Sequence, residues 1–134
     1  MRFLLDTHIV LWYVSDDSRL SEKAKAWISD GENEIYYSLV SVWEVAIKRQ
    51  TGKQRMPLSD EEFVAYAEGS GMNCLALNKK HIAALKTLAL RESAKEHHDP
   101  FDRILICQAK SENLILMTHD DALQGYGEPC VLIV

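Results

Sequence analysis

Residues 1–14 read MRFLLDTHIVLWYV, and this stretch decides the fold. The apolar run Phe3–Leu5 predicts a short strand that ends at Asp6. The segment from His8 to Val14 is apolar on nearly every side, which is typical of a short buried helix. We expect no secretory signal peptide, because Asp6 and His8 interrupt the apolar run and no small-residue cleavage site follows. A buried strand followed directly by a buried helix indicates an α/β protein.

The rest of the chain continues this alternation of apolar runs and segments with helical periodicity. The further expected strands are 34–38, 74–77, 114–117 and 131–134. The expected helices are 21–29, 41–50, 59–68, 79–90 and 100–112, with a helical turn at 120–124. Strand runs that are apolar throughout favour a parallel sheet covered on both faces. We therefore expect a single domain, 1–134, built as a three-layer α/β/α sandwich around a central, mostly parallel, five-stranded sheet.

Composition fits an ordinary globular domain. Of 134 residues, 47% are hydrophobic, and six glycines and three prolines are too few for a collagen-like or disordered chain. No apolar run approaches the roughly 20 residues that a membrane span needs. Cys74, Cys107 and Cys130 are odd in number, lie among apolar residues and lack metal-binding spacing. We expect buried free thiols and a reducing cytoplasm.

Four acidic residues fall beyond the carboxyl ends of the expected strands, where chemistry collects in an open parallel sheet. Asp6 follows the first strand directly, and Asp120 follows the 114–117 strand by two residues. Glu44 and Asp102 are each expected in the first turn of a helix. Four segments far apart in the sequence would thus deliver one carboxylate each to the same edge of the sheet.

These carboxylates also have purely structural interpretations. Ser41-Val-Trp-Glu44 matches a capping box, in which Glu44 would bond back to the Ser41 amide. Lys48 lies at the i+4 spacing of an ion pair with Glu44. Asp99-Pro-Phe-Asp102 matches a helix cap followed by an acidic first turn. Taken one at a time, the acidic residues are accounted for by capping and pairing.

The position of Asp102 argues against a purely structural role, because Leu105, Ile106 and Ala109 share its face of the helix. An ionised carboxylate on a core-facing stripe is costly unless it is paired or coordinates a metal. If all four carboxylates converge, the cluster requires a counter-charge. Oxygen ligands suit Mg²⁺ or Mn²⁺, and the lack of a paired Cys/His site disfavours Zn²⁺. Such a metal activates water for phosphodiester hydrolysis.

Four segments together carry a resemblance to a known family. They are LLDTHIVLW at 4–12, SLVSVWEVAIKRQTGK at 38–53, HHDPFDRILICQA at 97–109 and LILMTHD at 114–120. In this order they resemble the signature segments of PIN-domain proteins, and more closely those of the VapC-type toxins of toxin–antitoxin pairs. The resemblance implies a Mg²⁺- or Mn²⁺-dependent endoribonuclease that cuts structured RNA, such as loops of tRNA or ribosomal RNA.

The acidic quartet of that family falls on Asp6, Glu44, Asp102 and Asp120. Our hypothesis is that Asp6, Asp102 and Asp120 hold the metal, while Glu44 orients or deprotonates the attacking water. Cleavage would leave a 5′-phosphate and a 3′-hydroxyl. The auxiliary positions are Thr7, Asp99, Arg103 and Thr118.

Cations are unevenly distributed in a chain of net charge −5. Four of them lie within eight residues: Lys48, Arg49, Lys53 and Arg55. They form either a solvated helix end or a patch that contacts RNA phosphates. His97 and His98 offer a metal-free alternative, in which a histidine activates the RNA 2′-hydroxyl. Adjacent histidines point apart, which disfavours their joint action.

Six aromatic residues are candidates for the core or for a groove that receives a partner: Trp12, Tyr13, Trp27, Trp43, Phe63 and Tyr66. The resemblance implies a small VapB-like antitoxin whose C-terminal segment lies in such a groove and blocks the acidic site. It also implies a homodimer, for which helices 21–29 and 41–50 are candidate surfaces. The alternative function is a non-catalytic PIN-like module that holds RNA or a partner without cutting.

Overall fold

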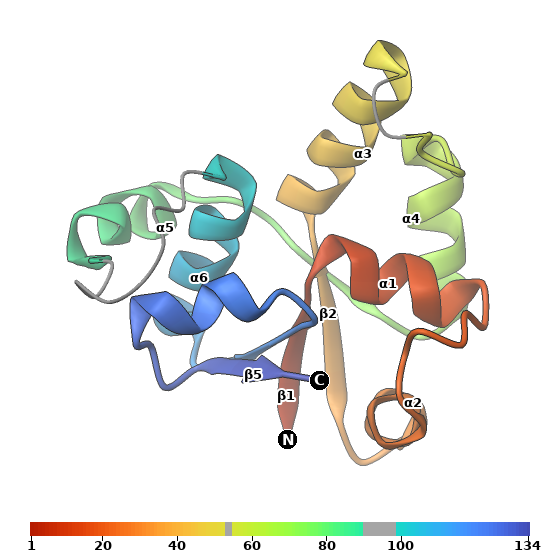
Figure 1. Ribbon diagram of the computed structural model, residues 1–134, viewed down its shortest axis with the longest axis horizontal. Coiled ribbons are helices and arrows are strands. Elements are labelled where there is room, and N and C mark those ends of the chain that lie inside the picture. Colours follow the sequence, from red (N-terminus) through yellow and green to blue (C-terminus); the bar gives the residue numbers. More distant parts are fainter. Residues whose placement is uncertain (53–54, 90–98) are drawn as a thin grey trace.

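A central sheet of five parallel strands forms the middle of the computed structural model, which describes residues 1–52, 55–89 and 99–134 (Figure 1). The strand order is β3-β2-β1-β4-β5, and every neighbouring pair is parallel. The strands are β1 (Arg2–Leu5), β2 (Glu34–Ser38), β3 (Asn73–Leu75), β4 (Ile115–Thr118) and β5 (Val131–Ile133). The first strand of the chain is therefore the middle strand of the sheet.

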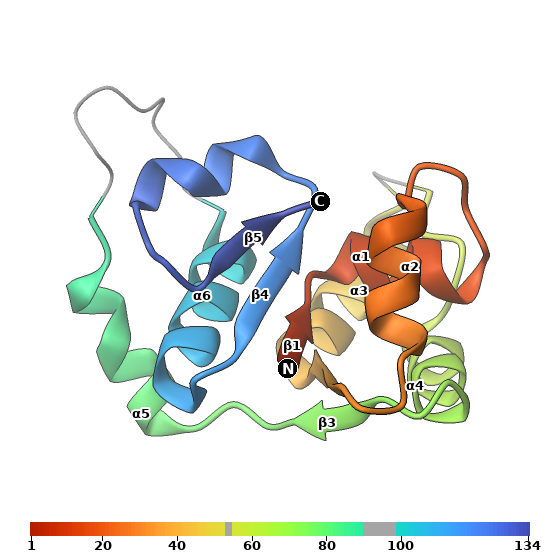
Figure 2. The same cartoon turned by 90° about the horizontal axis from the view of Figure 1, so that it is seen from below.

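Helices connect the strands and cover both faces of the sheet. They are α1 (Thr7–Val14), α2 (Glu22–Ser29), α3 (Leu39–Thr51), α4 (Asp60–Gly69), α5 (Lys79–Ala83) and α6 (Pro100–Glu112), with 3₁₀ turns η1 (Ala84–Thr87) and η2 (Asp121–Tyr126). Figure 2 shows α5 and α6 on one side of the sheet, and α1, α2 and α4 on the other. The predicted three-layer α/β/α sandwich with a five-stranded parallel sheet is confirmed.

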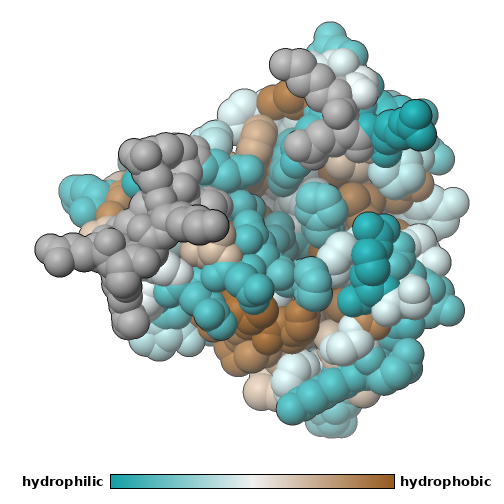
Figure 3. Space-filling model, in the orientation of Figure 1, coloured by the Kyte–Doolittle hydropathy of each residue, from teal (hydrophilic) through white to brown (hydrophobic). Residues whose placement is uncertain are grey.

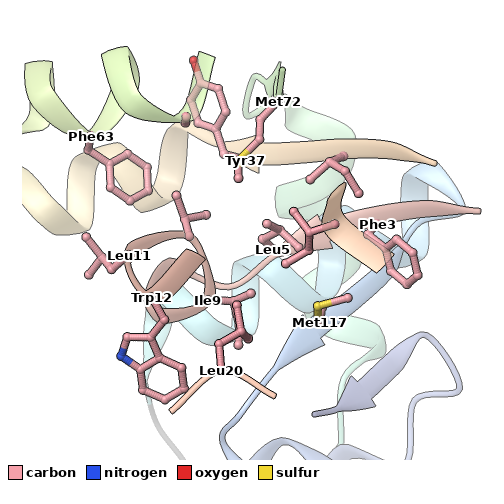
Figure 4. Packing of buried hydrophobic residues seen from close by; sticks show 14 of the residues in the cluster. Phe3, Leu5, Ile9, Leu11, Trp12, Leu20, Tyr37, Phe63, Met72 and Met117 are labelled. Carbon is pink, nitrogen blue, oxygen red and sulfur yellow. The ribbon is translucent and has the colours of Figure 1, made fainter. Parts of the chain in front are cut away.

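The central strand β1 is apolar throughout because both of its faces are buried. Phe3 and Leu5 pack into the core cluster that contains residues of α1, α2 and α4. Leu4, which points to the opposite face, packs into the cluster beneath α6. Figure 4 shows the first cluster, to which α1 contributes Trp12 and α4 contributes Phe63. The short apolar run thus separates two hydrophobic layers.

The helices that bear the candidate acids begin at side-chain caps. Asp6 caps α1, Ser38 caps α3 and Asp99 caps α6. Each side-chain oxygen accepts a backbone N–H of the first turn, which otherwise has no partner within the helix. Because α1 and α3 begin directly after β1 and β2, their first turns lie at the carboxyl edge of the sheet.

Helix α3 begins earlier than the sequence indicates. We predict a helix over 41–50, but Ser38 rather than Ser41 is the N-cap and Leu39 is the first helical residue. The Ser38 hydroxyl accepts the N–H of Val40 at 3.0 Å and donates to Oε1 of Gln108 at 2.6 Å. This second bond reaches across to α6 and is invisible to local sequence patterns.

Two further segments differ from expectation. The predicted helix 79–90 is divided, since α5 ends at Ala83 and the 3₁₀ turn η1 ends at Thr87. Leu88 is then extended, and it is buried in the cluster beneath α6. The strand predicted at 74–77 is the shorter β3, at the edge of the sheet.

The edges of the sheet are less well covered than its centre. Val131–Ile133 of β5 are half-buried, and Figure 3 shows hydrophobic side chains gathered around this strand and the C-terminus. Cys74 on the opposite edge strand is exposed, so the expectation of a buried thiol is wrong there, whereas Cys107 is buried. All three cysteines are free thiols. Within the described ranges no helix is long and apolar enough to span a membrane.

The packing of β4 against α6 gives a stability prediction. Leu116 is fully buried, and its replacement by alanine leaves a cavity that the surrounding layer cannot fill. We expect Leu116→Ala to lower the free energy of unfolding by about 2–5 kcal/mol in urea titrations. Leu77→Ala is the control, because Leu77 is 39% exposed. Equal losses for the two variants would contradict the assignment of Leu116 to the core.

Candidate active site

Asp6 is held at the end of β1 by two hydrogen bonds. Its Oδ1 accepts the N–H of Thr7 at 2.7 Å, and its Oδ2 accepts the hydroxyl of Thr118 at 2.7 Å. Thr118 Oγ1 in turn accepts the N–H of Asp120 at 3.1 Å. Asp6 is only 6% exposed. The two threonines therefore fix a buried carboxylate where the carboxyl ends of β1 and β4 meet.

Glu44 is buried and both of its oxygens are engaged. Oε1 accepts the Thr7 hydroxyl at 2.6 Å, and Oε2 forms an ion pair with Nζ of Lys48. The predicted Ser41–Glu44 capping box is wrong, and so is the placement of Glu44 in a first turn. Because α3 begins at Leu39, Glu44 lies in its second turn, where it faces α1. The alternative i+4 pair with Lys48 is the one that forms.

Asp102 and Asp99 lie together at the start of α6. Asp99 Oδ1 accepts the N–H of Phe101 at 2.9 Å and of Asp102 at 3.1 Å, so its capping interpretation is correct. Asp102 is half-buried in the first turn, on the face that carries the fully buried Leu105 and Ile106. Its side chain is therefore taken out of water by the same face that packs on the sheet.

Asp120 sits closer to solvent than the other three acids. It is exposed, and its Oδ1 accepts the N–H of Ala122 at 2.9 Å, which caps η2. Its backbone N–H is tied to Thr118, and Thr118 is tied to Asp6. Asp120 thus caps η2, and its backbone is held beside the carboxyl ends of β1 and β4.

The electrostatics show that these carboxylates are close enough to interact. Burial raises the pKa of Asp102 to about 8, together with the negative charges of Asp6, Asp99, Glu44 and Asp120. The pKa of Asp6 is also raised, first by burial and then by Glu44, although the hydrogen bond from Thr118 opposes this. Acids from four separate segments therefore share one electrostatic environment.

The site suits a hydrated divalent cation better than an enclosed one. In the described part of the chain, no group of three or more His, Cys, Asp and Glu side chains is placed to hold an ion. Mg²⁺ does not need such a cage, since it keeps several waters and uses one or two carboxylates plus substrate phosphates. The donors are oxygens, as hard cations prefer. A positive charge here would also lower the pKa of Asp102 and restore its ionised form.

Two of the four cations in the expected patch are engaged within the protein. Lys48 pairs with Glu44, and Nη1 of Arg49 donates to the carbonyl of Met56 at 3.2 Å. Arg55 is exposed, and Lys53 lies outside the described residues, as do His97 and His98.

Arg103, an expected auxiliary residue, is half-buried on α6. Burial raises the pKa of Tyr126, and the nearby positive charge of Arg103 partly offsets this rise. The guanidinium of Arg103 therefore lies near Tyr126, which is buried in the cluster beneath α6.

A cavity lies against α1, and none of the four candidate acids is in its wall. Its volume is about 590 Å³, and its wall includes His8, Trp12, Arg19, Arg55 and Tyr66. Arg19 lies over the Trp12 ring at 4.9 Å from the ring centroid. Trp12 and Tyr66 in this wall are two of the six aromatic residues that the sequence offers for a groove that receives a partner. The cavity thus extends from α1 to α4.

The family of the chain follows from comparison of its sequence with known domains. The model of the PIN domain family matches residues 3–129, and the chain belongs to this family. No curated protein sequence matches the chain.

Solved structures share the fold along nearly the full length of the chain. One is VapBC2 from Rickettsia felis bound to a promoter DNA fragment, with a TM-score of 0.67 and 15% identity, covering 100% of this chain and 98% of that one. Another is VapBC-1 from nontypeable Haemophilus influenzae, with a TM-score of 0.63, 19% identity and coverage of 99% and 98%. A toxin–antitoxin complex from Klebsiella pneumoniae has a TM-score of 0.56, 23% identity and coverage of 97% and 95%.

The raised pKa of Asp102 gives a pH prediction for the metal-free protein. The native pKa of about 8 lies above the usual 3.8, so the native state binds more protons than the unfolded state between these values. The free energy of unfolding therefore falls as pH rises through this window. We expect Asp102→Asn to remove this fall, with a gain of at least ~1 kcal/mol at pH 8 relative to pH 5 in urea titrations with chelator. A variant profile parallel to that of wild type would contradict it.

Proposed function

We propose that this PIN-domain protein is a Mg²⁺- or Mn²⁺-dependent endoribonuclease, the toxin of a type II toxin–antitoxin pair. The observation that carries the proposal is the hydrogen-bond network in which Thr7 joins Asp6 to Glu44 and Thr118 joins Asp6 to Asp120. The raised pKa of Asp102, whose causes include these carboxylates, adds Asp102 to the same cluster. Strongly perturbed carboxyl groups brought together from distant segments are typical of catalytic sites. The PIN family match and the resemblance to VapC-type toxins support the choice of RNA hydrolysis.

In the proposed reaction Asp6, Asp102 and Asp120 would hold the divalent ion, directly or through water. The ion supplies Lewis-acid stabilisation of the phosphate and lowers the pKa of water. Glu44, held by Thr7 and Lys48, orients a water in line with phosphorus or takes its proton. The water oxygen forms a bond to phosphorus while the bond to the 3′-oxygen breaks, and the 3′-oxygen gains a proton. The products carry a 5′-phosphate and a 3′-hydroxyl.

We infer that a VapB-like antitoxin controls this site through the cavity beside α1. Leu11, Val14 and Leu58 give the cavity an apolar wall, while Arg19 and Arg55 add positive charge. A segment anchored there lies next to His8, and from His8 the acidic site is two residues away. Such a segment would cover the carboxylates and exclude RNA. The free thiols fit the reducing cytoplasm in which such pairs would act.

We also infer a homodimer, formed through α3 rather than α2. Trp43 is 59% exposed and Leu39 is 43% exposed, and Trp43 packs edge-on against Phe101 of α6. By contrast, Trp27 of α2 is half-buried and Lys23 lies over its ring. Large apolar side chains left on one surface are typical of a surface that binds another protein.

The nuclease proposal predicts which carboxylates are required. We expect Asp6→Asn and Asp120→Asn to lose roughly 10³-fold or more in RNA cleavage with Mn²⁺, because each loses a charged oxygen ligand. Asp121→Asn is the matched control, an exposed acid one residue away that should keep wild-type activity. The readout is sequencing of the 5′ ends of RNA cut after brief induction.

Two outcomes would overturn the proposal of a metal-dependent nuclease. Cleavage that continues in excess chelator would favour the histidine route through the 2′-hydroxyl. Wild-type protein that binds RNA and never cuts it with Mn²⁺ present would favour the non-catalytic binding module.

The dimer proposal predicts the effect of a polar substitution at the exposed tryptophan. We expect Trp43→Ser to convert a dimer into a monomer at micromolar concentration, as measured by light scattering after size exclusion. Trp27→Ser on α2 should leave the dimer intact. Loss of the dimer in the α2 variant alone would assign the interface to the other candidate helix.

A further inference from the structure

We propose that Lys48 is an internal counter-cation that withholds Glu44 from the divalent ion and so keeps Glu44 available to position water. The inference rests on the proposed metal-dependent function, and it changes the role of Lys48. The charge run at 48–55 suggests a lysine that contacts RNA phosphates from the surface. In the structure the Lys48 ammonium instead contacts Glu44 in the acidic site.

The Lys48–Glu44 ion pair is buried. The Lys48 side chain is 17% exposed and the Glu44 side chain is 5% exposed, so both charges are largely removed from water. Surface ion pairs contribute little, but removal of one partner from a buried pair leaves the other charge uncompensated. An ammonium in this position is therefore a fixed part of the site.

Both oxygens of Glu44 have a partner, and one of these partners is a cation. Its Oε2 faces Lys48, and its Oε1 accepts the Thr7 hydroxyl at 2.6 Å. A hydroxyl has one proton to donate, so Thr7 Oγ1 accepts from the Ser41 hydroxyl, 2.8 Å away. This chain of bonds fixes the rotamer of Glu44. The positive charge of Lys48 beside Oε2 opposes the binding of a second cation to Glu44.

The partners of Glu44 differ in charge from those of Asp6. Asp6 accepts from two neutral donors, the N–H of Thr7 and the hydroxyl of Thr118, whereas Glu44 faces the ammonium of Lys48. An ammonium repels an incoming divalent cation, and a neutral donor does not. A cation entering the site is therefore held more readily by Asp6 than by Glu44. The position of Lys48 therefore decides which acids bind the ion and which acid orients the water.

Removal of Lys48 should change the affinity for the ion and the turnover in opposite directions. In Lys48→Met the released Glu44 becomes an additional ligand, so affinity for the ion rises. The same change removes the positioned carboxylate from the attacking water, so turnover falls. General structural damage would lower both quantities. A lysine that contacts RNA phosphates would instead raise KM for RNA and leave kcat unchanged.

The test measures Mn²⁺ binding, by electron paramagnetic resonance of free Mn²⁺, and cleavage kinetics on the same proteins. We expect K48M to bind Mn²⁺ roughly tenfold more tightly, as expected for removal of one nearby like charge. Its kcat should fall at least tenfold at saturating Mn²⁺, with KM for RNA within threefold of wild type. Lys48→Arg should retain most of the wild-type affinity, because it keeps the charge.

A double variant separates a specific effect from a general field. In the Glu44→Gln background there is no carboxylate to release, so adding K48M should change Mn²⁺ affinity less than threefold. Replacing both partners also removes the buried pair without leaving a lone charge, which keeps this comparison available if K48M alone is unstable. Lys25→Met, which breaks a surface pair with Asp16 and Glu22, is the matched control on α2.

The outcomes separate this inference from the proposed function. Wild-type protein that binds no Mn²⁺ would overturn the metal-dependent function itself. Equal Mn²⁺ affinity in wild type and K48M would overturn only the role of Lys48. An equal gain in Mn²⁺ affinity with and without the Glu44 carboxylate would show that Lys48 acts only as a distant charge. A raised KM for RNA with unchanged kcat would show that Lys48 binds RNA.

Discussion

The two hydrogen bonds to the Asp6 carboxylate join the centre of the sheet to the candidate site. One comes from the backbone at the start of α1, and the other comes from the Thr118 hydroxyl at the end of β4. Two donors only partly offset the cost of burying a carboxylate, and burial raises its pKa. Because β1 is the middle strand, any shift of Asp6 would disturb both neighbouring strands. The fold therefore holds an energetically unfavourable group in a fixed place.

Different charges act on Glu44 and on Asp102. Glu44 has an ammonium and a hydroxyl as partners, whereas Asp102 is influenced chiefly by burial and by four other acids. Stability given up at a cluster of like charges is a known property of functional sites. A divalent cation bound as we propose would recover it, and the free energy that destabilises the metal-free protein would then contribute to binding of the ion.

Most of the fold could be predicted from the sequence, because its signals are local. The strand 34–38 coincides with β2, and the proline after Asp99 marks the start of α6. The start of α3 could not be predicted, since two serines compete as its cap. The contact that favours Ser38, its bond to Gln108, joins residues 70 positions apart. Tertiary contacts of this kind decide element boundaries that local propensity leaves open.

Local sequence patterns likewise predict part of the candidate site, and tertiary packing determines the rest. The sheet-edge rule places the carboxylates near one another from strand order alone, although their catalytic roles stay predictions. A charge run gives no such guidance, because it does not say which face of a helix meets the core. Lys48 and Arg49 are neighbours in sequence, yet one pairs with a buried acid and the other bonds to a loop carbonyl. What separates them is Thr7 on α1, which holds the other oxygen of Glu44 and so turns an ordinary i+4 pair into a buried one.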